Sequence, residues 1–171
     1  RVLFRSHLVY DGGADGGNGL LTQRTAYVED STTDQRITNY LYDWRGRRIV
    51  ELPPLAPYTV TKFDNMGRAI AVGQYSSSSG LDATTDPTST ATNRMTLNET
   101  LYDELGRAWK TIRHKIDPAD GSDDDTLVSE TWFDAAGRVV KVDGNELKKT
   151  AYDRLGRVTS VYILAVDNDS T

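Results

Sequence analysis

The chain has no cysteine among its 171 residues, so it can form neither a disulfide framework nor a thiolate site. It has only two histidines, His7 and His114, and neither stands next to a plausible nucleophile or at the spacing of a metal-ligand pair. We assign both a plain strand or surface role. Because the usual components of nucleophilic and zinc-dependent sites are missing, we expect no catalytic residue and no enzyme activity.

Hydrophobic residues are also scarce, at 37% of the chain. A core built from so few apolar side chains is expected to be thin, one-sided or shared with neighbouring structure. No stretch approaches the roughly 20 apolar residues that span a bilayer, and residues 1–5 show neither an initiator Met nor a signal-peptide profile. We therefore expect an internal piece of a longer protein, with no membrane insertion in this segment.

Positive charge is sparse as well, since the formal net charge is -5 and no Lys- or Arg-dense block stands out. Binding to a polyanion such as nucleic acid requires a concentrated basic surface. The sequence therefore predicts no nucleic-acid partner.

What the sequence does contain is a six-residue phrase that occurs five times: an aromatic residue, Asp, two variable positions, Gly and Arg. Recurrence of this kind is typical of a repeat architecture. The aromatic, Asp, Gly and Arg positions of the five copies are Tyr42, Asp43, Gly46 and Arg47; Phe63, Asp64, Gly67 and Arg68; Tyr102, Asp103, Gly106 and Arg107; Phe133, Asp134, Gly137 and Arg138; and Tyr152, Asp153, Gly156 and Arg157.

Each position of the phrase suits a tight β-hairpin. Asp favours the first position of a type I turn, where its carboxylate accepts a hydrogen bond from the N–H two residues later. Gly then takes the left-handed conformation that closes the hairpin with a one-residue bulge. In this register the aromatic residue and the Arg face each other across the two strands, and we expect the guanidinium to lie on the ring of its own hairpin.

Strand-forming residues flank every copy, and no helix signal comes between them. The predicted fold is therefore all-β, made of consecutive antiparallel hairpins in a curved or spiralling sheet that is part of a shell, barrel or fibre. Residues 1–36 are predicted to form a degenerate hairpin with a Gly-rich tip, residues 37–164 the five hairpins, and residues 165–171 a tail or linker. Insertions at about 76–93 and 117–125 are expected to project from the sheet edge and to be mobile.

The recurring charged residues have alternative interpretations. The five Asp residues are explained by turn formation. The five Arg residues could form a row that binds carbohydrate or phosphate, but pairing with the facing ring and neighbouring carboxylates is the favoured interpretation. The acidic stretch 117–125, and separately Asp11, Asp15 and Asn18, offer oxygen ligands as calcium sites do. Both lack the bidentate Glu of the usual loop, so a solvated loop is favoured over calcium.

The phrase Tyr-Asp-x-x-Gly-Arg, with Thr two residues before the aromatic in four copies, resembles the RHS/YD repeat over roughly residues 37–164. The resemblance implies that the hairpins join edge to edge into a long sheet that spirals into a hollow shell or barrel, as in bacterial RHS toxins, insecticidal toxin-complex cocoons and teneurin adhesion proteins. It also implies a ladder of the five aromatic rings from hairpin to hairpin.

One feature of the toxin-encasing members is missing from this chain. Their self-cleaving protease segment carries an Asp-Pro-x-Gly-Leu type motif, and neither Asp86-Pro87 nor Asp117-Pro118 continues in that way. Toxin encapsulation therefore gains no support from these residues.

Taken together, the sequence predicts a structural or scaffolding segment of a large secreted or cell-surface bacterial protein. Its expected partners are neighbouring YD repeats of the same or another chain. Two alternatives stay open: a self-assembling extracellular filament subunit, since an open sheet edge invites pairing, or an adhesion module that binds glycans or surface proteins.

Overall fold

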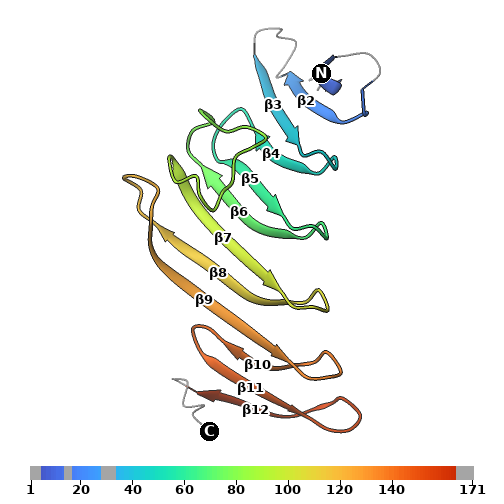
Figure 1. The fold of residues 1–171 in the computed structure, drawn as a ribbon, viewed down its shortest axis with the longest axis vertical. Coiled ribbons are helices and arrows are strands. Elements are labelled where there is room, and N and C mark those ends of the chain that lie inside the picture. The colour runs from blue at the N-terminus through green and yellow to red at the C-terminus, as the bar shows by residue number, and fades with distance from the viewer. Residues whose placement is uncertain (1–4, 14–16, 28–33, 165–171) are drawn as a thin grey trace, which may run out of the picture. The chain divides into compact units, whose positions relative to one another are not determined.

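The computed structural model describes residues 5–13, 17–27 and 34–164, and this part of the chain is all-β (Figure 1). Twelve strands form one sheet in which neighbours in space are also neighbours in sequence, and the predicted class of consecutive antiparallel hairpins is confirmed. Within the described ranges the one helical element is a short 3-10 turn at Asp11–Gly13, and no helix there is long and apolar enough to cross a membrane.

Each repeat turn joins an odd-numbered strand to the next even-numbered one. The strands are β1 (Arg5–Tyr10), β2 (Leu21–Tyr27), β3 (Gln35–Tyr42), β4 (Arg48–Leu52), β5 (Tyr58–Phe63), β6 (Ala69–Tyr75), β7 (Arg94–Tyr102), β8 (Ala108–Ile116), β9 (Asp123–Phe133), β10 (Val139–Asp143), β11 (Leu147–Tyr152) and β12 (Val158–Leu164).

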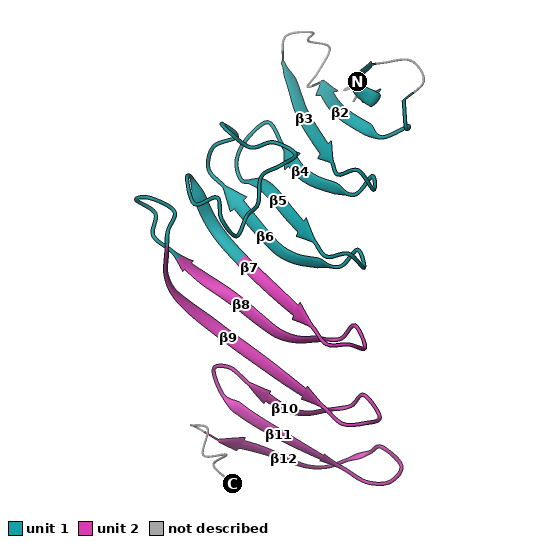
Figure 2. Cartoon of the chain, viewed as in Figure 1, with its two compact units in different colours: residues 1–97, 116–122 teal, residues 98–115, 123–171 magenta. Residues whose placement is uncertain are grey.

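The chain divides into two compact units, which Figure 2 shows in different colours. Unit 1 comprises residues 1–97 and 116–122, and unit 2 comprises residues 98–115 and 123–171. Strand β7 runs from the first unit into the second.

Unit 1 has a small core on one face of the sheet. Val50 of β4 and Val60 of β5 are cross-strand partners and are fully buried, together with Tyr75 at the end of β6. Partly buried side chains such as Leu52 and Tyr58 pack around them. A few β-branched and aromatic side chains opposite each other stabilise adjacent strands, which suits a chain with so little apolar material.

The first insertion does not project from the sheet, contrary to the sequence-based expectation. It folds back over β5 and β6, and its Pro87 is one of the most completely buried side chains in the described residues. The space for Pro87 exists because Gly73 of β6 has no side chain: a Cβ there would lie 2.9 Å from the Pro87 Cβ. Two further contacts hold the insertion, a Lys62–Asp86 ion pair of 2.5 Å and a hydrogen bond of 3.0 Å from the Tyr75 hydroxyl to the Thr90 carbonyl.

The second insertion is shorter than predicted and packs against the first. Residues 117–122 form the tip, whereas 123–125 already belong to β9. The buried Arg94 donates from Nε to the Gly121 carbonyl at 3.2 Å and from Nη1 to the Pro87 carbonyl at 2.9 Å. Because one guanidinium binds a carbonyl from each insertion, the two loops are joined within unit 1. The expectation of projection is wrong for the first insertion, whereas residues 117–120 of the second are exposed.

Unit 2 buries much less, and Leu147 is the only fully buried hydrophobic side chain among its described residues. The last strand, β12, carries several half-exposed or exposed apolar side chains, among them Tyr162 and Ile163. A thin, one-sided core of this kind agrees with the low hydrophobic content of the sequence.

The predicted degenerate hairpin corresponds to β1 and β2, which pair antiparallel with a register shift at Val9/Tyr10. The Asp11 carboxylate organises its Gly-rich tip by accepting hydrogen bonds from the N–H groups of Gly19 at 3.0 Å and Leu20 at 3.2 Å. Asp15 and the predicted tail at 165–171 lie outside the described residues.

Candidate functional site

The five repeat turns share one hydrogen-bonding pattern. In the first, Asp43 Oδ1 accepts from the Arg45 N–H at 2.9 Å, the Gly46 N–H donates to the Asp43 carbonyl at 2.9 Å, and Gly46 has a φ of 74°. The same bonds occur in the other four copies, and their Gly φ values lie between 80° and 85°. The predicted type I turn with a left-handed Gly is therefore confirmed at all five positions.

The Arg of each phrase pairs with the Asp that opens its own turn. Arg47 donates from Nε to Asp43 Oδ2 at 2.7 Å, while its backbone N–H donates to Asp43 Oδ1 at 3.0 Å. Equivalent pairs close the other four turns at 2.6 to 2.7 Å. One carboxylate thus fixes both the turn backbone and the direction of the guanidinium.

These hydrogen bonds lower the pKa values of the five turn carboxylates. The backbone N–H of Arg68 is the main cause that holds the pKa of Asp64 below its usual 3.8, although desolvation opposes it. At Asp43 desolvation is the largest single influence and raises the pKa, but the combined hydrogen bonds from Arg47 and Arg45 lower it overall. The other three turn carboxylates also have lowered pKa values. The native turns therefore favour ionised Asp.

The ring partner of each Arg differs from the one expected. The Arg47 guanidinium lies 4.9 Å from the ring centroid of Phe63, which belongs to the next hairpin and not to its own. The corresponding distances are 4.3 Å from Arg107 to Phe133 and 4.7 Å from Arg138 to Tyr152. The prediction of a contact within one hairpin is wrong at these three steps.

The one-residue bulge explains the difference. It shifts the register next to the aromatic residue, so the Cα partner of Tyr42 is Arg48 and not Arg47. The same shift pairs Phe63 with Ala69 and Tyr152 with Val158. The Arg that follows Gly is instead held by its own Asp and extends to the neighbouring hairpin.

Further hydrogen bonds strengthen these links between hairpins. Arg47 Nη1 donates to the Asp64 carbonyl at 2.8 Å, and Arg138 Nη1 lies 3.5 Å from the Asp153 carbonyl. In the opposite direction, the Tyr152 hydroxyl donates to the Val139 carbonyl at 2.8 Å. The family resemblance implied a ladder of aromatic rings. At the three Arg–ring contacts above, a guanidinium group of one hairpin lies against the ring of the next.

Arg157, in the last turn, lacks such a partner within the described part of the chain. Its side chain is 74% exposed and pairs with Asp153 at 2.7 Å, but no ring of a described residue lies against it. It sits beside β12, which is the last strand in the sheet order.

The acidic residues considered for calcium are engaged in other ways. Asp117 Oδ1 accepts from the Ala119 N–H and Asp120 Oδ1 from the Ser122 N–H, both at 2.8 Å. Asp124 pairs with Lys115 at 2.5 Å. Among residues 5–13, 17–27 and 34–164 no group of three His, Cys, Asp or Glu side chains could hold a metal ion. The structure uses these carboxylates to cap turns and to pair with Lys.

The two histidines differ in their surroundings. His7 is exposed on β1. In unit 2, His114 of β8 lies between two carboxylates, with Nε2 at 2.7 Å from Glu99 Oε1 and Nδ1 at 3.2 Å from Asp123 Oδ2. This arrangement was not predicted from the sequence. Three different strands supply one residue each, and the spacing of the three residues matches no known motif.

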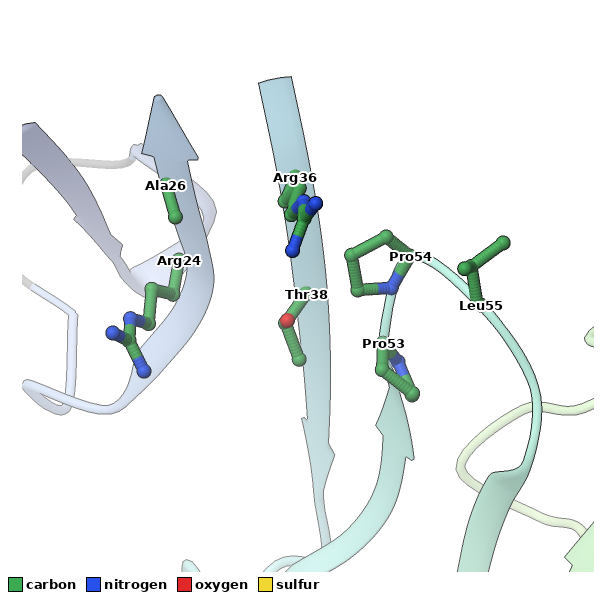
Figure 3. Close-up of a pocket in the computed structure, with 7 residues that line it drawn as sticks. All are labelled: Arg24, Ala26, Arg36, Thr38, Pro53, Pro54 and Leu55. Carbon is green, nitrogen blue, oxygen red and sulfur yellow. The ribbon is translucent and has the colours of Figure 1, made fainter. Parts of the chain in front are cut away.

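A second feature that the sequence did not indicate is a pocket in unit 1 (Figure 3). Its volume is about 540 Å³. It is lined by Arg24, Ala26, Arg36, Thr38, Pro53, Pro54 and Leu55. The lining residues lie outside the repeat phrase, and only the pairing of β2 with β3 brings the two arginines to one place.

No protein-family model matches the chain, and no curated protein matches it. Solved structures do match. The crystal structure of TcdB2-TccC3-Cdc42 is 11% identical, with 85% of this chain and 11% of that chain covered and a TM-score of 0.39. The crystal structure of TcdB2-TccC3 without its hypervariable C-terminal region is 12% identical, with 94% and 10% covered and a TM-score of 0.42. The chain spans about a tenth of the length of these solved chains.

Proposed function

We propose that this chain is a structural segment of RHS/YD-type repeats that forms part of the wall of a β-sheet shell or fibre in a large secreted or cell-surface bacterial protein. The observation that carries the proposal is the contact between repeats: the Arg of one turn lies on the aromatic ring of the next hairpin. An Arg that contacts the aromatic ring of the next hairpin links consecutive hairpins into one sheet.

The chemistry of the turns favours this role over catalysis. Each of the five Asp residues is held by its own turn and its own Arg. Their lowered pKa values keep them ionised at neutral pH, whereas a general acid requires a pKa near the working pH. The recurring charges are therefore suited to closing hairpins and joining them. The placement outside a bacterial cell comes from the family resemblance alone.

The edge at β12 supports docking of a further hairpin, from the same or another chain. Tyr162 and Ile163 are 57% and 64% exposed there, and the Arg157 guanidinium is free to lie on an incoming ring. An exposed strand edge with apolar side chains readily pairs with another strand. The neighbouring-repeat partner predicted from the sequence fits this edge.

The docking can be tested by appending a second copy of residues 144–164 directly after Leu164. This places the new Tyr 21 residues after Tyr152, the same separation as between Tyr42 and Phe63. We expect hydrogen exchange of the β12 amides that face away from β11 to slow at least tenfold. In the control, the copy of Tyr152 is replaced by Ser, and the β12 amides should be less protected from exchange than in the first extended chain. Unchanged exchange in both extended chains would contradict the proposal.

The adhesion alternative has its own supporting observation. The variable positions of several turns carry exposed apolar side chains: Trp44 is 85% exposed, and Met66, Leu105 and Leu155 are also exposed. Exposed apolar residues on loop tips are a common feature of binding surfaces. Binding to a glycan array that is lost in Trp44→Ser would favour this function. The filament alternative rests on the open β12 edge, and fibres that form with increasing chain concentration would favour it.

A further inference from the structure

The pocket in unit 1 combines two positive charges with an aliphatic wall (Figure 3). Arg24 lies on β2 and pairs in register with Thr38 of β3, while Arg36 of β3 pairs with Ala26 of β2. All four residues lie on the same face of the two strands because they are directly paired and two positions apart. The two arginines are thus diagonal neighbours, with Cα atoms roughly 7–8 Å apart in such an arrangement.

Neither arginine is neutralised by a described residue. In the described ranges, the side chains of Arg24 and Arg36 make no ion pair, hydrogen bond or ring contact, whereas all five repeat arginines pair with carboxylates. Both arginines are exposed, so a ligand in solution can reach their guanidinium groups. The two guanidinium groups are therefore available to an anionic ligand, whose charge would complement theirs.

The other residues that line the pocket indicate which class of anion it could bind. Pro53, Pro54 and Leu55 form one wall, and Leu55 is 80% exposed although it is a large apolar side chain. Thr38 adds a hydroxyl group that can donate a hydrogen bond. None of the described residues that line the pocket is aromatic. Sugars are commonly bound against an aromatic ring, whereas Pro and Leu suit aliphatic groups.

The geometry points to a site for a short peptide that carries a carboxylate next to an aliphatic side chain. Guanidinium groups bind carboxylates in a planar, two-bond geometry, and a pair of them can enclose one carboxylate. The volume of about 540 Å³ lies in the range of ordinary ligand pockets and fits a few residues of peptide. A long polyanion is disfavoured because the chain itself carries a net charge of -5.

The source of the carboxylate is either an Asp or Glu side chain or the carboxyl terminus of the peptide. Two probes distinguish these sources: acetyl-Leu-Asp-Leu amide, which has only the side-chain carboxylate, and acetyl-Leu-Asn-Leu with a free carboxyl terminus. In a ¹H–¹⁵N NMR titration of the intact chain, we expect saturable shifts of the Arg24 and Arg36 Nε–H signals with at least one probe. Acetyl-Leu-Asn-Leu amide, which has no carboxylate, should bind at least tenfold more weakly.

Matched variants test where the probe binds. The double variant Arg24→Gln and Arg36→Gln should lower the affinity at least tenfold, and circular dichroism will show whether the sheet is retained. The control is Arg113→Gln, because Arg113 is an exposed arginine of β8 outside the pocket. An equal loss in Arg113→Gln, or no saturable shift in the unaltered chain, would overturn the assignment. So would a glucuronate-containing disaccharide that binds more tightly than both peptides, since it would make the ligand a glycan.

Discussion

The Arg47 guanidinium is held at 2.7 Å by Asp43 of its own turn and lies 4.9 Å from the ring centroid of Phe63 in the next hairpin. One side chain therefore serves both the closure of a turn and the contact between turns. The same relationship recurs from Arg107 to Phe133 and from Arg138 to Tyr152. A repeat joined in this way does not need a deep core, because each hairpin is fixed by the one before it.

The left-handed glycine of each turn is predicted to be required. Gly106 has a φ of 80°, where a β-branched side chain clashes with its own backbone. We expect Gly106→Val to lower the free energy of unfolding by at least about 1 kcal/mol, measured by urea denaturation. Gly106→Asn should cost clearly less, since Asn tolerates this conformation. Equal stability of the Val variant and the unaltered chain would argue against the turn geometry.

Acid is predicted to weaken the turns. All five turn carboxylates have pKa values lowered below 3.8, so their ionised form stabilises the fold at neutral pH. This contribution is fully present above pH 3.8 and is lost as the pH falls through the lower native values. The melting temperature should change little from pH 7 to 5 and fall below pH 4. Asp64→Asn should be less stable at pH 7 and lose less on acidification, and a parallel pH profile would contradict this explanation.

Gly73 is predicted to be needed for the first insertion to pack. In Gly73→Val the new Cβ would lie 2.9 Å from the Pro87 Cβ, so the insertion must shift or detach. Overpacking of this kind costs about 1–3 kcal/mol. Limited proteolysis should then cleave within residues 76–93 faster than in the unaltered chain. Gly144→Ala is the control, because its nearest neighbour is the Ser129 hydroxyl at 3.2 Å, which can rotate away. Equal cleavage rates in all three chains would count against the packing.

The local part of the structure was accessible from the sequence. The turn at Asp43 and Gly46 depends on residues within five positions of each other, so propensities alone predict it. The partner of Arg47 was mispredicted because a one-residue bulge changes which residue stands opposite the aromatic ring. A bulge alters register without leaving a separate mark on the hydrophobic pattern.

The remaining misses involve contacts that no local rule covers. The first insertion reads as a polar loop, and its burial depends on the absence of a side chain at Gly73 opposite Pro87. The pocket of Arg24 and Arg36 depends on the pairing of β2 with β3. In each case residues that are unremarkable in the sequence acquire a role only when the sheet brings them together.

The contact between a turn Arg and the ring of the next hairpin is tested most directly by comparing Arg107→Ala with Arg157→Ala. Both arginines pair with their own turn Asp, at 2.6 and 2.7 Å, but Arg107 also lies 4.3 Å from the Phe133 ring. Removing Arg107 should therefore lower the free energy of unfolding by about 0.5–1 kcal/mol more than removing Arg157, as determined by urea denaturation. Equal losses of unfolding free energy in the two variants would contradict the claim that the contact between Arg and ring links the repeats.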